Sequence, residues 1–304
     1  MTIDDSNRRS GDWRDEYPFA SHFLPCGEHR MHYLDEGTGV PILCVHGNPT
    51  WSFYWRRVVA EFRESARVVA VDHIGCGMSD KPSRYSYTLQ QHTSNLADLV
   101  DRLDLDRITL VAHDWGGAIG LGVLARMPER FSRIVLLNTG AFPPPFCPWR
   151  IRVCRWPLVR SVGVIGFNAF ARAALYMTTA RAPLAKTARA GLIAPYDRPA
   201  NRIAIRRFVE DIPLSTRHPT WPVLERLEAD LKKLAFRPTA LIWGMKDWCF
   251  TVECLDRLER IFPGAETTRI EDAGHYVMED AAEDVMSAMR AFFDRHPVEA
   301  ARGS

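Results

Sequence analysis

A single aspartate stands where the surrounding sequence predicts an exposed, reactive side chain. Asp114 follows an apolar run at residues 108–111 that is typical of a buried strand, and it precedes small and apolar residues at 117–124 suited to a helix. A nucleophile between small residues at such a junction is typical of a nucleophile elbow, a tight turn that lifts one side chain above a sheet. A carboxylate is already ionised at neutral pH and attacks carbon without a base to deprotonate it. An aspartate at this position therefore indicates a displacement reaction at an electrophilic carbon of the substrate, rather than the acyl transfer that a serine would perform.

Two further residues follow Asp114 in the order expected of a catalytic triad. Asp247 comes just after a late predicted strand, and His275 lies in the loop after the last predicted strand. Both are therefore expected at the carboxyl edge of the sheet, beside Asp114. We expect His275 to take a proton from water that attacks a covalent ester on Asp114, while Asp247 fixes the tautomer of His275 and stabilises its charged form. Asn138, at the end of another predicted strand, is an amide and cannot supply the charge of the acid.

The sequence His-Gly-Asn-Pro at residues 46–49 predicts an anion site opposite Asp114. The backbone N–H groups of Asn48 and Trp115 would form a hole for negative charge, and the side chains of the same residues add an amide and an indole donor. Two neutral donors beside a carboxylate suit a leaving group that departs as an anion, such as halide. Structural roles are expected for His46, His73 and His113.

The elements that must position these residues alternate along the chain. Helical spacing covers residues 88–103 and 285–293. The predicted strands cover residues 31–37, 41–47, 67–72, 108–111, 133–138, 239–244 and 266–270. Alternating buried strands and helices predict an α/β fold, with a mostly parallel twisted sheet and helices on both faces.

This alternation stops at the prolines 143–145, and the sequence up to about residue 230 is helix-like. We interpret residues 142–230 as an inserted helical cap on a core formed by residues 1–141 and 231–304. The insertion is rich in aromatic side chains that could line an apolar tunnel or pack the cap onto the core: Phe142, Phe146, Trp149, Trp156, Phe167, Phe170 and Trp221.

Charge is distributed unevenly between these two parts. Residues 142–230 contain 14 Lys and Arg against 6 Asp and Glu, a balance of +8, whereas the remainder carries 25 against 31, or −6. A basic insertion fits an anionic neighbour, such as a membrane surface, an acyl-processing partner enzyme or another copy in a homo-oligomer. A solvated helical surface would give the same pattern.

Composition narrows the class of protein further. The chain has no apolar stretch long enough to span a bilayer, and its polar, acidic N-terminus does not predict a secretory signal. Seven scattered cysteines without a C-x-x-C pair favour a reducing compartment over a disulfide framework or a zinc site. We therefore expect a cytoplasmic enzyme that needs no metal or cofactor and acts on a small apolar substrate, with a peripheral position at the membrane as the alternative. No nucleic-acid recognition motif is present.

At these residues the chain resembles the haloalkane dehalogenases of the α/β-hydrolase superfamily. The likeness runs from about residue 17 to residue 293 and is strongest at His-Gly-Asn-Pro, His-Asp-Trp-Gly-Gly and Ala-Gly-His-Tyr. It implies an α/β-hydrolase fold and hydrolysis of haloalkanes through an aspartyl ester. The implied roles are nucleophile for Asp114, base for His275, acid for Asp247 and halide-stabilising pair for Asn48 with Trp115. The Asn-Trp pair with an acid after the later strand is similar to the third dehalogenase subfamily, although Ala112 stands where many members have Gly.

A second resemblance lies in the cap. Residues 166–172, 194–197, 201–203 and 211–214 look like the β-lactone decarboxylases of bacterial long-chain olefin biosynthesis, which share the Asp nucleophile. That resemblance implies opening of a cis-dialkyl β-lactone to a cis-olefin and carbon dioxide, with the anion site serving a developing carboxylate. Both reactions need an ionised nucleophile, an anion site and an apolar tunnel, so the elbow residues do not separate them. We place dehalogenation first and this decarboxylation second.

Other functions fit the residues less well. An epoxide hydrolase uses the same Asp-His-Asp set but needs cap tyrosines to protonate the epoxide oxygen, and the cap has only Tyr176 and Tyr196. A fluoroacetate-type dehalogenase would carry an arginine where Trp115 stands. A non-catalytic ligand receptor on the same fold is disfavoured by the five intact site positions.

Overall fold

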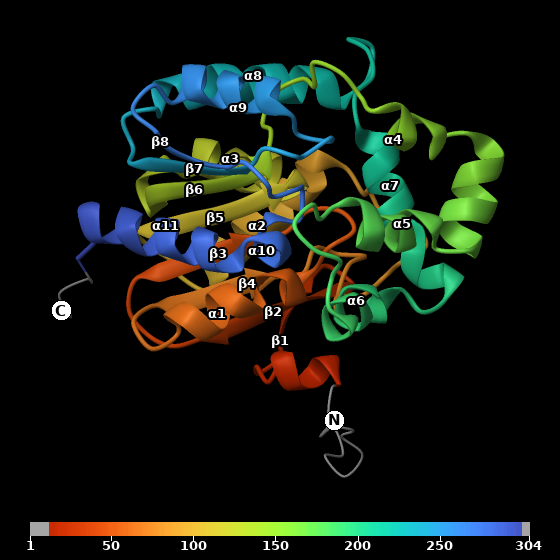
Figure 1. Cartoon of the computed structure of the whole chain (residues 1–304), viewed down its shortest axis with the longest axis horizontal. Coiled ribbons are helices and arrows are strands. Elements are labelled where there is room, and N and C mark those ends of the chain that lie inside the picture. Colours follow the sequence, from red (N-terminus) through yellow and green to blue (C-terminus); the bar gives the residue numbers. More distant parts are fainter. Residues whose placement is uncertain (1–11, 300–304) are drawn as a thin grey trace.

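A computed structural model describes residues 12–299, which form one eight-stranded sheet in the order β1-β2-β4-β3-β5-β6-β7-β8 (Figure 1). The strands are β1 (His22–Cys26), β2 (His29–Glu36), β3 (Pro41–Val45), β4 (Arg67–Val71), β5 (Ile108–Asp114), β6 (Phe131–Thr139), β7 (Thr239–Gly244) and β8 (Glu266–Ile270). All neighbours from β4 to β8 in this order are parallel, and β2 is antiparallel to both β1 and β4. The predicted α/β class with a mostly parallel sheet is confirmed.

Helices cover both faces of the sheet (Figure 1). On one face lie α2 (Leu89–Arg102), α3 (Trp115–Arg126), α8 (Thr220–Lys233) and α9 (Val252–Ile261). On the other lie α1 (Arg56–Phe62), the short α10 (Val277–Asp280) and α11 (Ala282–Arg295). The two layers bury the central strands β3, β5 and β7 along their whole length, which explains why these strands read as continuous apolar runs.

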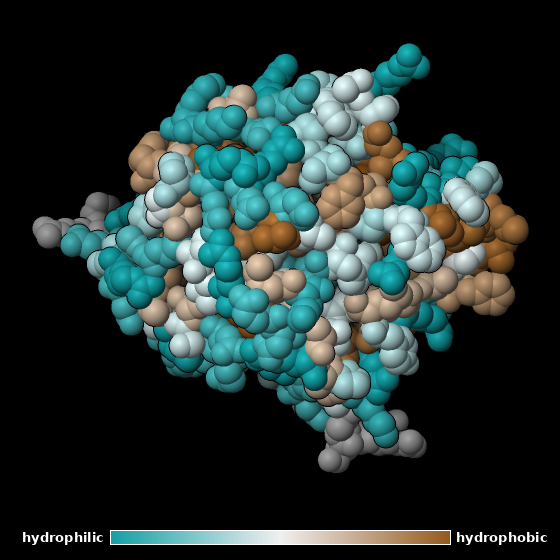
Figure 2. Space-filling view, turned by 45° about the horizontal axis from the view of Figure 1, so that its top comes forward, coloured by the Kyte–Doolittle hydropathy of each residue, from teal (hydrophilic) through white to brown (hydrophobic). Residues whose placement is uncertain are grey.

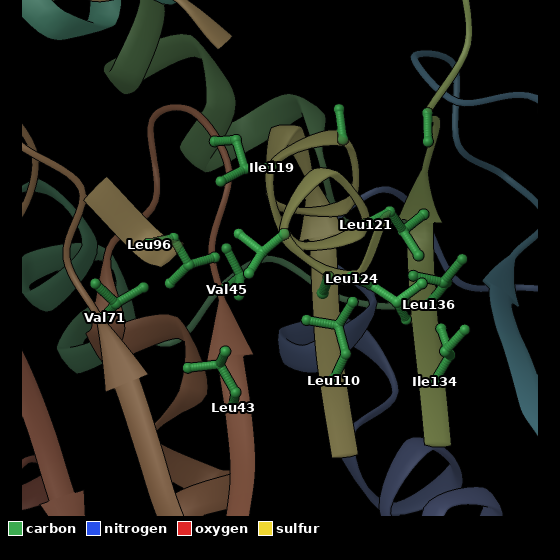
Figure 3. Packing of buried hydrophobic residues seen from close by; sticks show 14 of the residues in the cluster. Leu43, Val45, Val71, Leu96, Leu110, Ile119, Leu121, Leu124, Ile134 and Leu136 are labelled. Atoms are coloured by element: carbon green, nitrogen blue, oxygen red, sulfur yellow. The ribbon is translucent and has the colours of Figure 1, made fainter. Parts of the chain in front are cut away.

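Successive strand residues point to opposite faces and so enter different apolar clusters. In β3, Leu43 and Val45 pack towards α2 and α3, whereas Ile42 and Cys44 pack towards α1 and α11. Figure 3 shows the first cluster, in which strand side chains meet Ile119 and other residues of α3. Burial of each such aliphatic side chain stabilises the fold by about 1.5–3 kcal/mol relative to exposure. This packing fixes β5 and α3, the elements on either side of Asp114.

Between β6 and β7 the described chain contains helices and no strand. They are α4 (Trp149–Val153), the π-helical segment η5 (Val159–Gly166), α5 (Ala169–Met177), α6 (Lys186–Ile193), the short 3-10 helices η6 (Ala194–Tyr196) and η7 (Pro199–Arg202), α7 (Ile203–Asp211) and α8. Helices α4 to α7 lie at one end of the molecule, whereas α8 packs on α3 and α9 of the core (Figure 1). The division into a core of residues 1–141 and 231–304 and a cap of residues 142–230 remains a prediction, and α8 crosses its boundary at residue 230.

Two further features complete the fold. Strand β1 was not among the predicted strands; it is a partly exposed edge strand that contains Pro25. Within residues 12–299, no helix is long and apolar enough to cross a membrane.

Candidate active site

Asp114 sits at the tip of a strained turn between β5 and α3. Its backbone has φ 53° and ψ −131°, a conformation that L-residues rarely adopt. The turn leaves no room for side chains after it: a Cβ on Gly116 would lie 2.1 Å from Val45 O, and one on Gly117 would lie 1.9 Å from Thr139 Oγ1. The predicted elbow is therefore present, and its glycines are required because the backbone of Val45 and the side chain of Thr139 lie against them.

One oxygen of the Asp114 carboxylate lies between two backbone donors. Asp114 Oδ1 accepts hydrogen bonds from the N–H of Asn48 at 2.8 Å and from the N–H of Trp115 at 2.6 Å. Gly47 permits this approach, because a Cβ there would lie 2.1 Å from Asp114 Oδ1. The other oxygen, Oδ2, makes no backbone hydrogen bond in the described chain and faces His275 Nε2 at 3.4 Å. Oδ2 is thus the oxygen available for attack.

His275 lies between two carboxylates. Its Nδ1 is 2.8 Å from Asp247 Oδ2, and its Nε2 faces Asp114. All three residues are nearly inaccessible to solvent. The structure therefore brings together the three residues that the sequence order predicted, from the ends of β5 and β7 and the loop after β8.

The charges in this group shift the pKa values of both His275 and Asp114. Burial lowers the pKa of His275, but the adjacent Asp247 and Asp114 outweigh burial and raise it to about 10. Burial raises the pKa of Asp114, yet the hydrogen bond and charge of His275 leave it below its ordinary value. The two neighbouring carboxylates therefore favour the charged, imidazolium form of His275.

Asn138 orients the acid, a contact that the sequence did not predict. Its Nδ2 donates to Asp247 Oδ2 at 2.9 Å, and the N–H of Cys249 donates to Asp247 Oδ1 at 2.6 Å. Asp247 thus has partners on both oxygens besides His275. Sequence reasoning examined Asn138 only as a possible acid and missed its role as a donor.

The side chains of Asn48 and Trp115 both border the space in front of Asp114. Asn48 Nδ2 donates to Ile205 O of α7 at 3.2 Å, so one amide hydrogen is bound to the cap and the second is not engaged by the described chain. The indole N–H of Trp115 has no hydrogen-bond acceptor among residues 12–299, and its ring contacts Phe208 with centroids 5.7 Å apart. Two neutral donors are therefore available beside the carboxylate.

A cavity of about 440 Å³ adjoins Asp114, and its walls are mainly apolar. Four of the seven cap aromatics named from the sequence line it: Phe142, Phe146, Trp149 and Phe170. The other three, Trp156, Phe167 and Trp221, do not. Trp248 and Phe250 also line it, and they were missed although they follow Asp247 directly in sequence.

The three histidines expected to have structural roles, His46, His73 and His113, make buried contacts. His46 Nε2 accepts from the N–H of His73 at 3.1 Å, and His113 Nε2 donates to the carbonyl of His275 at 2.8 Å. Burial lowers the pKa of each of them, so they are neutral near pH 7. His113 supports the loop that carries His275. Among the described residues, no cluster of His, Cys, Asp and Glu could hold a metal ion.

Comparison with known proteins agrees with this architecture. A decarboxylase of cis-3-alkyl-4-alkyloxetan-2-ones from Shewanella oneidensis is 42% identical over 284 residues, covering 90% of this chain and 88% of the relative. Haloalkane dehalogenase 2 of Mycobacterium bovis is 34% identical over 280 residues, covering 90% and 94%. The crystal structure of the haloalkane dehalogenase DatA from Agrobacterium tumefaciens superposes with a TM-score of 0.81 at 25% identity, covering 91% and 96%. The family model described as the alpha/beta hydrolase fold matches residues 40–282, and this chain therefore belongs to the α/β-hydrolase family of enzymes.

Proposed function

We propose that this protein decarboxylates cis-3-alkyl-4-alkyloxetan-2-ones, with Asp114 as the nucleophile. The observation that carries the proposal is the ionised carboxylate of Asp114, which is held by two N–H groups on the wall of a mainly apolar cavity. The sequence alone placed dehalogenation first. We reverse that order because the relative named for decarboxylation is 42% identical, against 34% for the dehalogenase.

The first step opens the four-membered ring. Asp114 Oδ2 attacks ring carbon C4 from the side opposite the ring oxygen, and a C–O bond forms between them. The bond from C4 to the ring oxygen breaks, and its electron pair remains on that oxygen as a carboxylate. The side-chain donors of Asn48 and Trp115 stabilise this developing anion. The product of the step is an ester of Asp114 with inverted configuration at C4.

The second step releases both products. The carboxylate leaves as carbon dioxide, the electron pair of the C2–C3 bond forms the C3=C4 double bond, and the bond from C4 to Asp114 Oδ2 breaks. Inversion followed by anti elimination keeps the two alkyl groups on the same side and gives a cis-olefin. Neither water nor a net proton transfer is required, so His275 remains an imidazolium that stabilises the returning charge on Asp114, oriented by Asp247.

Hydrolytic dehalogenation is the second candidate, favoured by the two neutral donors beside the nucleophile, which suit a departing halide. Formation of the ester removes the charge of Asp114, and the pKa of His275 then falls because one of its two carboxylate neighbours is lost. His275 could then take a proton from the attacking water. An epoxide hydrolase is less well supported, because neither cap tyrosine, Tyr176 or Tyr196, lines the cavity.

Side-by-side incubation with a long-chain cis-β-lactone and with 1-bromohexane tests the proposal. We expect cis-olefin and carbon dioxide from the lactone, without formation of the β-hydroxy acid that hydrolysis of the lactone would give. Bromide release without olefin formation would instead assign the second candidate. Turnover of neither probe would contradict both.

A further inference from the structure

The cap carries a group of large apolar side chains on its surface. We define the cap patch as Trp149, Trp156, Leu158, Val162 and Phe167, all exposed; Leu158 and Phe167 are 73% and 71% accessible. They belong to one 19-residue stretch that includes α4 and η5, residues 149–167. Figure 2 shows apolar residues gathered at the cap end of the molecule. Exposed apolar side chains of this size along one short stretch of chain indicate a binding surface.

The surroundings of the cap patch are basic and contain no acidic residue of their own segment. Residues 142–196 include eight Lys and Arg and no Asp or Glu. Arg150 and Arg152 are exposed and form no ion pair with any residue between 12 and 299. Arg150 instead lies near the rings of Trp149 and Trp248, with its guanidinium 5.6 Å and 5.3 Å from their centroids. The surface therefore combines apolar anchors with uncompensated positive charge.

The cap patch also adjoins the cavity that contains Asp114. Trp149 belongs to both, because it is 70% exposed and lines the cavity. Phe146 and Met177 are likewise exposed and line the cavity. The apolar surface therefore continues into the walls of the cavity.

We propose that the cap patch docks on an anionic lipid bilayer and opens the cavity towards the hydrocarbon. Aromatic and aliphatic side chains interleaved with arginines are the composition of segments that lie in a membrane interface, where rings enter the acyl boundary and guanidinium groups contact anionic headgroups. Charge disfavours a second copy of the same surface, because two basic caps repel each other. An apolar substrate concentrates in the bilayer, so docking supplies it directly to the cavity.

Vesicle co-sedimentation of the full chain tests docking independently of the reaction. The probes are vesicles of phosphatidylcholine mixed with phosphatidylglycerol, and vesicles of phosphatidylcholine alone. We expect binding to the mixed vesicles that is weaker in high salt. Trp156→Ser with Phe167→Ser should reduce this binding at least tenfold, and Arg150→Glu with Arg152→Glu should reduce it similarly.

The matched control is Phe236→Ser, which removes a 77% exposed aromatic outside the cap patch and should leave binding unchanged. Trp156 and Phe167 do not line the cavity, so the double Ser variant should retain its thermal transition and its turnover of detergent-dispersed substrate. Three results would overturn the proposal. The first is that the unmodified protein does not bind mixed vesicles, and the second is that Phe236→Ser loses as much vesicle binding as the double Ser variant. The third is that the unmodified protein forms a dimer that dissociates in the double Ser variant, while neither protein binds vesicles. Asp114→Asn should lose turnover and keep vesicle binding, so a failure of the proposed reaction can be told apart from a failure of membrane docking.

Discussion

Asn138 Nδ2 lies 2.9 Å from Asp247 Oδ2, although the two residues are 109 positions apart in the chain. The same amide donates to Gly244 O at 3.0 Å, and its Oδ1 accepts from the N–H of Gly244 at 2.9 Å. Asn138 also has a positive φ of 33°, which turns its side chain at the end of β6 towards β7. One buried amide thus ties the end of β6 to the turn that presents Asp247.

Asn138→Leu should therefore weaken both the site and the fold. The variant leaves the backbone groups of Gly244 and one oxygen of Asp247 without this partner, each at a cost of about 1–3 kcal/mol. We expect kcat to fall at least about tenfold because Asp247 holds His275 less firmly. Urea unfolding and initial rates measure the two effects. An unchanged kcat in a destabilised protein would limit Asn138 to a structural role.

Gly47→Ala should inactivate the enzyme by displacing the nucleophile. The new methyl group would lie 2.1 Å from Asp114 Oδ1 and 2.3 Å from Asp114 Cβ, so the carboxylate must leave its two N–H donors. We expect a loss of at least about a hundredfold in kcat/KM. Gly264→Ala, where nothing lies within 4 Å of the added Cβ, is the matched control and should be fully active. Equal activities of the two variants would show that the backbone at residue 47 does not lie close to the carboxylate of Asp114.

Trp115→Phe should lower kcat/KM about tenfold to a hundredfold, because it removes an N–H that donates to a developing anion while keeping an aromatic ring. The control is Trp221→Phe, since the indole N–H of Trp221 is also without a partner among the described residues but does not line the cavity. Steady-state kinetics on the lactone measure both. A similar rate for both variants would exclude the Trp115 indole from the anion site.

His275 should make the stability of the protein depend on pH in a defined direction. Its pKa is raised from 6.5 to about 10, so its contribution is fully present below about pH 6.5 and is lost as the pH rises through 10. The pKa of Asp114 is lowered from 3.8, so its contribution is present above that value and is lost at lower pH.

The measurement is the free energy of unfolding of the unmodified protein minus that of His275→Gln, obtained in urea across this range. The difference should be largest from about pH 4 to pH 6.5 and should shrink towards pH 10. A difference that grows with pH over the same interval would show that His275 is neutral in the folded protein.

Much of the fold could be predicted because the buried strands are continuous apolar runs. β5, for example, is buried along its whole length, and the residues that follow it identify the turn at Asp114. β1 escaped prediction because it is an edge strand, partly exposed and interrupted by Pro25. Burial in the core leaves a continuous apolar run in the sequence, and a partly exposed edge strand does not.

The order of Asp114, Asp247 and His275 likewise indicated the site, because parallel strands bring their carboxyl ends to one edge. Side-chain contacts across that edge could not be predicted. Asn138 contacts Asp247 from the neighbouring strand, 109 positions away, and Asn48 contacts Ile205 of α7, 157 positions away. Both contacts depend on tertiary packing rather than on local sequence.

The central claim, that the charged carboxylate of Asp114 attacks carbon, is tested most directly by the turnover of Asp114→Asn. The amide can still accept from the N–H groups of Asn48 and Trp115, so the elbow should fold, as circular dichroism and thermal melting would show. The measurement is the initial rate of olefin formation from a long-chain cis-β-lactone, with bromide release from 1-bromohexane in parallel. We predict rates below about one-hundredth of the unmodified enzyme on both. A folded variant that retains more than that on either substrate would contradict the assignment of Asp114.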